Sequence, residues 1–248
     1  MKRVWRLVAL VLLAGIGLQL FFLVRIALAA TVDPQSTTFQ RSEAWRIATG
    51  GKPFRWRQQW VPYERISNNL KRAVIASEDD RFASHEGVDW EALEKAWERN
   101  ERAEARAARQ QARASTRSQL AAPKRPKIVG GSTITQQLAK NLLLSGERTF
   151  LRKGQEIVLT FALERMLSKE RILEVYLNSV EWGEGVFGAE AAARHYYRKP
   201  AAQLSAYEAA RLAVMLPRPR YFEKLPNSGY LASRASTIVA RMREADLP

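Results

Sequence analysis

The sequence contains no cysteine and only two histidines, His85 and His195. Without cysteine, the chain cannot form a disulfide framework, a thiolate metal site or a cysteine nucleophile. So few histidines argue against a His-rich zinc site and remove the commonest general base from most mechanisms. Carboxylate side chains are therefore the natural candidates for acid–base chemistry.

The chain has fewer acidic than basic residues. Its 248 residues include 25 Asp and Glu against 40 Lys and Arg, which gives a formal charge of +15. Hydrophobic residues make up 46% of the chain and charged residues 26%, both near the globular average, which excludes a wholly disordered or collagen-like chain. A chain of this length suits one domain, or one domain with a membrane anchor.

One long run without charge, LVALVLLAGIGLQLFFLV, extends from Leu7 to Val24. A helix from Leu7 to Ala30 would rise about 36 Å at about 1.5 Å per residue, enough to cross a hydrocarbon core of about 30 Å. We therefore expect a transmembrane anchor over residues 7–30. The alternative is a cleaved signal peptide, but the run exceeds the roughly 7–15 residues of a typical h-region.

The flanks of this run predict its orientation. Lys2, Arg3 and Arg6 precede it in a short tail over residues 1–6. By the positive-inside rule, such a tail stays in the cytoplasm and everything after residue 30 lies on the outer side of the membrane.

Residues 31–62 contain several prolines and glycines together with Trp45, Trp56 and Trp60. This composition predicts an irregular connector near the membrane. Its tryptophans suit either the membrane surface or ordinary packing onto the domain, and the sequence leaves both interpretations open.

Residues 63–248 have a helical pattern. Apolar residues at helical spacing predict a helix that ends near Glu78. Thr133 with Gln136, and Ser205 with Glu208, have the spacing of capping boxes at helix starts. No stretch shows convincing strand alternation, so the expected fold class is mainly α.

A basic segment covers about residues 95–127, where ten Lys or Arg residues face three acids. Arginines recur every three or four residues and would share one helical face: Arg99, Arg102, Arg106, Arg109, Arg113 and Arg117. This face suits contact with anionic lipid headgroups, or it is a solvated face of a flexible insert.

Glu78 directly follows the apolar run Ala73-Val74-Ile75-Ala76. A carboxylate held against apolar neighbours has its pKa raised towards the working pH, as a general base requires. The alternative is an acidic helix end that pairs with a local base such as Arg81.

The segment GGSTITQQLAKN begins at Gly130 and Gly131 and leads into a helix start, where backbone N–H groups and the helix dipole favour an anion. Gln137, Lys140 and Asn141 follow at spacing i, i+3, i+4 and project together. Arg148, Arg152 and Lys153 add positive charge shortly after, and Glu156 follows them. Such a set can hold a phosphate-rich ligand and stabilise a departing pyrophosphate.

Together and in this order, these segments resemble the monofunctional, membrane-anchored members of the glycosyltransferase family that polymerises peptidoglycan, glycosyltransferase family 51. The stretches that carry the resemblance cover most of residues 70–200: Glu78, Asp79, Phe82, His85 and Gly87; GGSTITQQLAKN; Arg152, Lys153 and Glu156; KERILEVYLN; and WGEGVFGAEAA. The segment between Trp90 and Lys127 departs from the family pattern, because it is longer and more basic than expected.

The resemblance implies a lysozyme-like helical glycosyltransferase domain over residues 63–248 with a membrane-dipping lobe, polymerising lipid II with inversion and releasing undecaprenyl pyrophosphate. It makes Glu78 the base and Glu156 a second acidic residue of the catalytic site. Substrate contacts are implied for a larger set: Asp79, Phe82, His85, Ser132, Thr133, Gln136, Gln137, Lys140, Asn141, Arg148, Arg152 and Lys153.

The same resemblance implies an inner-membrane enzyme whose domain is periplasmic, with lipid II, the growing glycan chain and cell-wall transpeptidases or division proteins as partners. The outward orientation of the domain argues against nucleic acid as a partner. No cofactor is required by the sequence, although the carboxylates at residues 78–80 leave assistance by Mg²⁺ or Mn²⁺ open. We expect no transpeptidase activity, because no S-x-x-K motif occurs and some thirty residues follow Pro217.

Two other functions compete with this interpretation. A lytic glycan hydrolase or transglycosylase also uses one glutamate in a lysozyme-like fold, but it needs no pyrophosphate-binding cations. A non-catalytic, membrane-anchored protein could bind anionic lipid through the arginine face.

Overall fold

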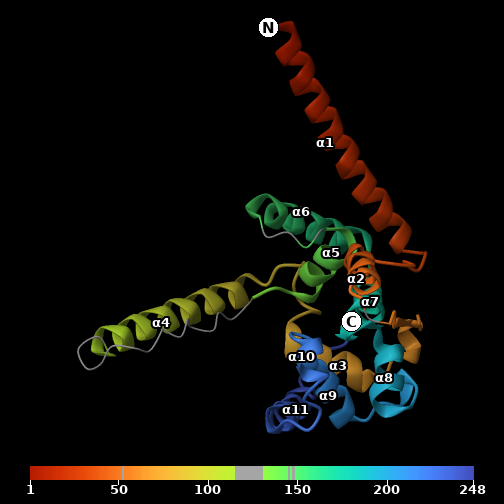
Figure 1. The fold of residues 1–248 in the computed structure, drawn as a ribbon, viewed down its shortest axis with the longest axis vertical. Coiled ribbons are helices and arrows are strands. Elements are labelled where there is room, and N and C mark those ends of the chain that lie inside the picture. The colour runs from red at the N-terminus through yellow and green to blue at the C-terminus, as the bar shows by residue number, and fades with distance from the viewer. Residues whose placement is uncertain (52, 115–130, 145, 147–148) are drawn as a thin grey trace.

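The computed structural model describes residues 1–51, 53–114, 131–144, 146 and 149–248. Most of this chain is helical, as the sequence predicts (Figure 1). The helices are α1 (Lys2–Ala29), α2 (Thr38–Thr49), α3 (Asn68–Glu78), α4 (Trp90–Ala114), α5 (Ile134–Leu143), α6 (Phe150–Met166), α7 (Lys169–Ser179), α8 (Ala189–Tyr197), α9 (Ala206–Met215), α10 (Pro219–Phe222) and α11 (Gly229–Arg241), with 3₁₀ turns η1 (Tyr63–Arg65) and η2 (Ala201–Gln203).

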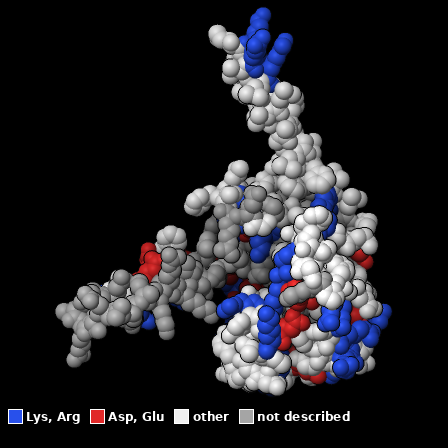
Figure 2. Space-filling view, in the orientation of Figure 1, with Lys and Arg blue, Asp and Glu red and all other residues white. Residues whose placement is uncertain are grey.

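The N-terminal helix α1 is long and apolar enough to cross a membrane. It projects from the folded body, and only its end nearest the domain packs there, through Phe22, Ile26 and Ala29 (Figure 1). Figure 2 shows Lys and Arg side chains at its free end and an uncharged surface between that end and the domain. The expected span over residues 7–30 thus coincides with one continuous, mostly exposed helix.

The prediction of an irregular connector over residues 31–62 is wrong for the part that forms α2 (Thr38–Thr49). Thr37 and Gln40 form a capping box at the start of this helix, because the Thr37 hydroxyl accepts from the Gln40 N–H and the Gln40 side chain accepts from the Thr37 N–H. Of the tryptophans, Trp45 is exposed while Trp56 stacks on Phe187, with ring centroids 4.5 Å apart. Packing onto the domain is therefore confirmed for Trp56, and contact of the exposed Trp45 with the membrane surface stays a prediction.

The helices form two neighbouring groups. In the first, α3 packs against α9 and α11, at the end of the body farthest from α1. In the second, α5 packs against α6, α7 and α2, nearer to α1 (Figure 1). Both capping boxes expected from the sequence are present, Thr133 with Gln136 before α5 and Ser205 with Glu208 before α9. The α3 helix ends at Glu78, as its apolar pattern predicts.

A small sheet joins these groups, in the order β1 (Arg57–Gln58), β3 (Val186–Phe187), β2 (Glu181–Gly183). The β1 strand pairs parallel with β3, and β2 pairs antiparallel with β3. Gly185 and Gly188 have φ angles of +68° and +85°, and a Cβ at either would lie within 3 Å of a backbone oxygen. A side chain at either glycine would therefore clash with the backbone, and strands this short leave no alternation to detect in the sequence.

The first part of the basic segment continues α4, which projects sideways from the body (Figure 1). Arg99, Arg102, Arg106 and Arg109 are exposed on it. Two acids on the same helix pair with basic residues four positions on, Glu91 with Lys95 and Glu98 with Arg102. The side chains of Arg113 and Arg117 lie outside the described residues. Exposure of these arginines is compatible both with a solvated face and with contact to anionic lipid headgroups, so both interpretations stay open.

Candidate active site

Glu78 is the last residue of α3, where its half-buried carboxylate meets α5. The Gln137 side-chain N–H donates to Glu78 Oε2 at 3.0 Å, and the Tyr176 hydroxyl donates to Gln137 Oε1 at 3.0 Å. Burial raises the pKa of the Glu78 carboxyl, and the hydrogen bond from Gln137 opposes that rise. The Tyr176 contact fixes the Gln137 amide so that its N–H groups, not its oxygen, face the carboxylate.

The alternative partner for Glu78, Arg81, is engaged elsewhere. Its guanidinium forms ion pairs with Asp89 and Glu91. Glu78 therefore has a neutral amide as its neighbour rather than a neutralising cation, which leaves its carboxylate able to accept a proton.

Asp79 joins the end of α3 to the start of α5. Its Oδ2 accepts from the Ile134 backbone N–H at 2.9 Å, and its Oδ1 lies 2.8 Å from His85 Nε2. Because His85 Nδ1 accepts from the Gly87 N–H at 3.0 Å, the ring carries its proton on Nε2 and donates to Asp79. The anion expected at this helix start is therefore supplied by a carboxylate of the chain itself.

Two more of the residues implied as substrate contacts, Thr133 and Gln136, hold the start of α5. The Thr133 hydroxyl donates to the Gly87 carbonyl at 2.6 Å, and Gln136 completes the capping box. Phe82 is fully buried beneath the Lys169 ammonium, which lies 4.6 Å from the ring centroid. Ser132 is exposed beside them. These residues, with Asp79 and His85, are not among those lining the cavity described next.

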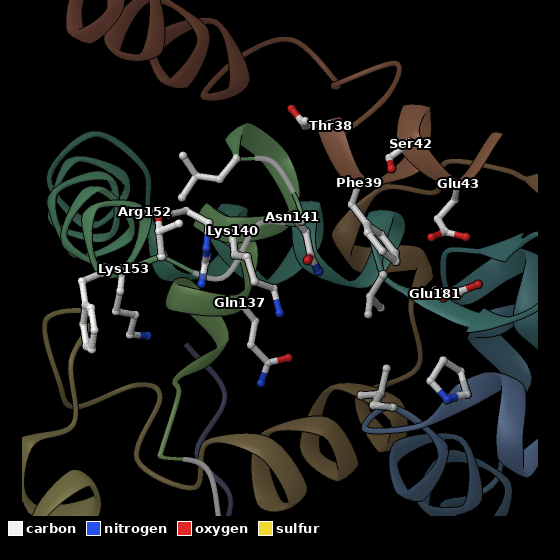
Figure 3. Close-up of a pocket in the computed structure, with 17 residues that line it drawn as sticks. Thr38, Phe39, Ser42, Glu43, Gln137, Lys140, Asn141, Arg152, Lys153 and Glu181 are labelled. Carbon is white, nitrogen blue, oxygen red and sulfur yellow. Dashed lines mark hydrogen bonds between the residues drawn. The ribbon is translucent and has the colours of Figure 1, made fainter. Parts of the chain in front are cut away.

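A cavity of about 880 Å³ opens beside Gln137. Gln137, Lys140 and Asn141 reach it from one face of α5, as their spacing predicts, while Arg152 and Lys153 reach it from α6 (Figure 3). We call Lys140, Arg152 and Lys153 its cationic end. Because Gln137 touches both the cavity and Glu78, the carboxylate adjoins the same space through one side chain.

Glu156 lies behind the cationic end and is almost fully buried. Its Oε2 accepts from Arg152 Nη1 at 2.9 Å, and its Oε1 accepts from Lys153 Nζ. The Arg152 Nε atom is buried and has no hydrogen-bond partner among the described residues. Arg148 lies outside the described residues.

The opposite wall of the cavity contains residues that sequence reasoning missed. Thr38, Phe39, Ser42 and Glu43 come from α2, and Glu181 comes from β2 (Figure 3). We call Glu43 and Glu181 the acidic end. The capping-box spacing of Thr37 and Gln40 was the signal that could have revealed α2.

The carboxylates of the acidic end are paired with arginines. Arg220 donates to Glu181 Oε1 at 2.7 Å and also pairs with Glu43, while Arg46 donates to Glu43 at 2.7 Å. Burial raises the pKa of the Glu181 carboxyl, and Arg220 opposes this. The cavity is therefore bipolar, with unequal ends that can orient an elongated ligand.

The acidic residues at 78–80 do not converge on one point. Glu78 turns to Gln137, both oxygens of Asp79 meet N–H donors, and Asp80 pairs with Arg241 at 3.0 Å. In the part of the chain that the structure describes, no group of three or more His, Cys, Asp or Glu residues could hold a metal ion.

Comparison with known proteins gives consistent matches. A family model described as Transglycosylase matches residues 47–243. A biosynthetic peptidoglycan transglycosylase of Burkholderia orbicola (strain MC0-3) is 51% identical over 235 residues, which cover 95% of this chain and 87% of the relative. A protein of the same name from Herminiimonas arsenicoxydans is 49% identical over 247 residues, which cover 100% of this chain and 98% of the relative.

Proposed function

The chain belongs to the transglycosylase family and is a peptidoglycan glycosyltransferase, and from that premise we propose that it polymerises lipid II into glycan strands. One observation supports this most strongly: a carboxylate with a raised pKa adjoins, through Gln137, a cavity with three cations at one end. That arrangement suits a sugar transfer in which a proton is taken on one side and a diphosphate departs on the other.

In the proposed reaction, Glu78 takes the proton from the sugar 4-hydroxyl of the acceptor lipid II. The oxygen of that hydroxyl forms a bond to the anomeric carbon of the growing chain, and the bond from this carbon to the pyrophosphate oxygen breaks. The anomeric centre is inverted, and undecaprenyl pyrophosphate carries away the bonding electrons. A single displacement needs one base and no carboxylate nucleophile, so Glu78 alone suffices near the reacting carbon.

The cationic end stabilises the charge that develops on the leaving pyrophosphate. Lys140, Arg152 and Lys153, which line the cavity, supply charge-assisted hydrogen bonds. Glu156 neither lines the cavity nor meets the reacting carbon in this scheme. Its role is to fix the directions of Arg152 and Lys153.

The chemistry proposed here requires no resident metal, because protein cations already neutralise the leaving group. It also requires no cofactor and no nucleic acid. The chain has no S-x-x-K motif, so the proposed product is uncrosslinked glycan, and a separate transpeptidase must join it to the wall.

We place the domain on the periplasmic face of the inner membrane, with α1 as a retained anchor. The basic tail before residue 7 supports this orientation. Retention is supported by the packing of Phe22, Ile26 and Ala29 on the domain, since cleavage after Ala29 would remove these contacts.

An experiment with two substrates distinguishes polymerisation from glycan cleavage. Purified full-length protein is incubated with lipid II and, separately, with preformed peptidoglycan sacculi. We expect glycan strands from lipid II and no change in the sacculi. Soluble fragments released from sacculi, with lipid II left intact, would show a lytic enzyme instead.

A further inference from the structure

The apolar run of α1 contains a single polar side chain, Gln19, within residues 7–24. This residue forms a reciprocal amide pair with Gln155 of α6. Gln19 Nε2 donates to Gln155 Oε1 at 2.8 Å, and Gln155 Nε2 donates to Gln19 Oε1 at 2.9 Å. Each amide thus satisfies the other, although 136 positions separate the two residues in the chain.

Gln19 is the outermost member of the docked face of α1. Phe22, Ile26 and Ala29 are buried on the same face at spacing i+3, i+7 and i+10 from Gln19, while residues 2–18 are exposed. At the domain end, Arg171 Nε donates to the Ala29 carbonyl at 2.8 Å. The anchor is therefore fastened at both ends of its docked half, by Arg171 and by the amide pair.

The partner helix α6 needs this support at its N-terminal end. Its first residues, Phe150 and Leu151, are 98% and 86% exposed and so contribute little packing. Gln155 follows within two turns, directly between the cavity cations Arg152 and Lys153 and their partner Glu156. The amide pair with α1 consequently restrains the part of α6 that carries the cationic end.

We propose that Gln19 is a positioning residue for sugar transfer: through Gln155, the membrane anchor holds the first turns of α6 so that Arg152 and Lys153 face the departing pyrophosphate. This inference rests on the proposed function and on α1 spanning the membrane. In a hydrocarbon core, an amide without a partner is costly, which favours the closed pair. The anchor then acts as part of the active-site scaffold in addition to tethering the domain.

The test uses full-length protein in lipid nanodiscs, with Gln19→Leu, Gln155→Leu, the double variant, and Leu20→Ala as a control on the exposed side of α1. Because Gln19→Leu makes α1 more apolar, weaker membrane insertion cannot explain a loss of activity. The absence of native cysteine allows spin labels at Leu12→Cys and Val158→Cys, two exposed positions on α1 and α6. Pulsed electron resonance then measures the distance between the two helices.

Gln19→Leu should broaden the label-to-label distance and lower kcat/KM for lipid II roughly five- to thirtyfold, equivalent to about 1–2 kcal/mol. The pH midpoint of kcat/KM should stay unchanged, because the variant leaves Glu78 and its hydrogen bond from Gln137 in place. The double variant should lose no more than either single variant, because both change the same contact.

Several results would overturn the inference: unchanged kcat/KM in Gln19→Leu, an equal loss in Leu20→Ala, additive losses in the double variant, or an unaltered distance. Failure of the wild-type protein to extend lipid II would instead refute the proposed function. The distance measurement still tests the amide pair in that case, since it needs no turnover.

Discussion

At the scale of single residues, the site depends on the partner of one carboxylate, which among the described residues is a neutral amide. Glu78 has a neutral amide beside it, while Arg81, the nearby base, is occupied by Asp89 and Glu91. Burial then raises the Glu78 pKa, which would not occur beside a guanidinium. The residues around Glu78 therefore favour proton acceptance over a structural ion pair.

The acid limb of the pH–rate profile depends on the pKa of the Glu78 carboxyl. Since the base acts when deprotonated, kcat/KM should fall as the pH drops through a value above 4.5, the ordinary glutamate pKa. Gln137→Leu removes a hydrogen bond that favours the ionised carboxylate, so it should raise the Glu78 pKa and move this limb to higher pH. Tyr176→Phe leaves that hydrogen bond in place and should move the limb less. A limb that moves to lower pH in Gln137→Leu would contradict the assignment.

A pair of variants can show whether sugar transfer needs the cations of the cavity in particular or only positive charge anywhere near the membrane. Arg152→Gln should lower kcat/KM for lipid II by roughly ten- to a hundredfold, the value of one charge-assisted hydrogen bond of about 1.5–3 kcal/mol. Arg165→Gln removes the same charge from an exposed position at the other end of α6 and should have little effect. Equal losses in the two variants would show that only overall charge near the bilayer matters.

At the scale of elements, α5 is the piece that brings the proton acceptor and the cavity together. It carries Gln137 and Lys140, and its first turn is fastened to the end of α3 by Asp79 and to Gly87 by Thr133. Residues that resemble substrate contacts in the sequence thus contribute by fixing one helix against another. Their side chains lie in this junction and do not line the cavity.

Two adjacent aspartates allow a matched test of this junction. Asp79→Ala leaves the Ile134 N–H and the His85 ring without their acceptor and should cost at least about 2 kcal/mol, a fall in Tm of roughly 4–8 °C. Asp80→Ala removes only an exposed pair with Arg241 and should stay within about 0.5 kcal/mol of wild type. Similar Tm values for both variants would refute the role given to Asp79.

Helices were predictable where local rules govern them. The capping boxes before α5 and α9 and the end of α3 at Glu78 follow from spacing within a few residues. The α2 helix was missed because prolines, glycines and tryptophans later in residues 31–62 outweighed the Thr37–Gln40 signal. The β strands escaped because two or three residues carry no periodicity.

At the scale of the whole molecule, the cavity has a cationic end on α5 and α6 and an acidic end on α2 and β2. The sequence predicted the cationic side, since Gln137, Lys140 and Asn141 share a helix face. It could not predict the acidic end, because Glu43 and Glu181 lie far apart in the chain and meet only through Arg220. The Gln19–Gln155 pair was hidden for the same reason.

We expect the membrane anchor and the cavity to act together in sugar transfer. The end of α6 that carries Arg152 and Lys153 faces the cavity and is held to α1 through Gln155. A lipid-linked donor brings its diphosphate to the same boundary between membrane and solution. In the function proposed above, the cations on the helix fastened to the anchor would meet the diphosphate there.

The most direct measurement compares glycan synthesis and lipid II binding in wild type, Glu78→Gln and the exposed control Glu64→Gln, all in the same nanodiscs. Loss of a general base should slow polymerisation by about 10²–10⁴-fold in Glu78→Gln while lipid II still binds, and Glu64→Gln should match wild type. Near-normal glycan synthesis by Glu78→Gln would contradict the central claim that this carboxylate takes the acceptor's proton.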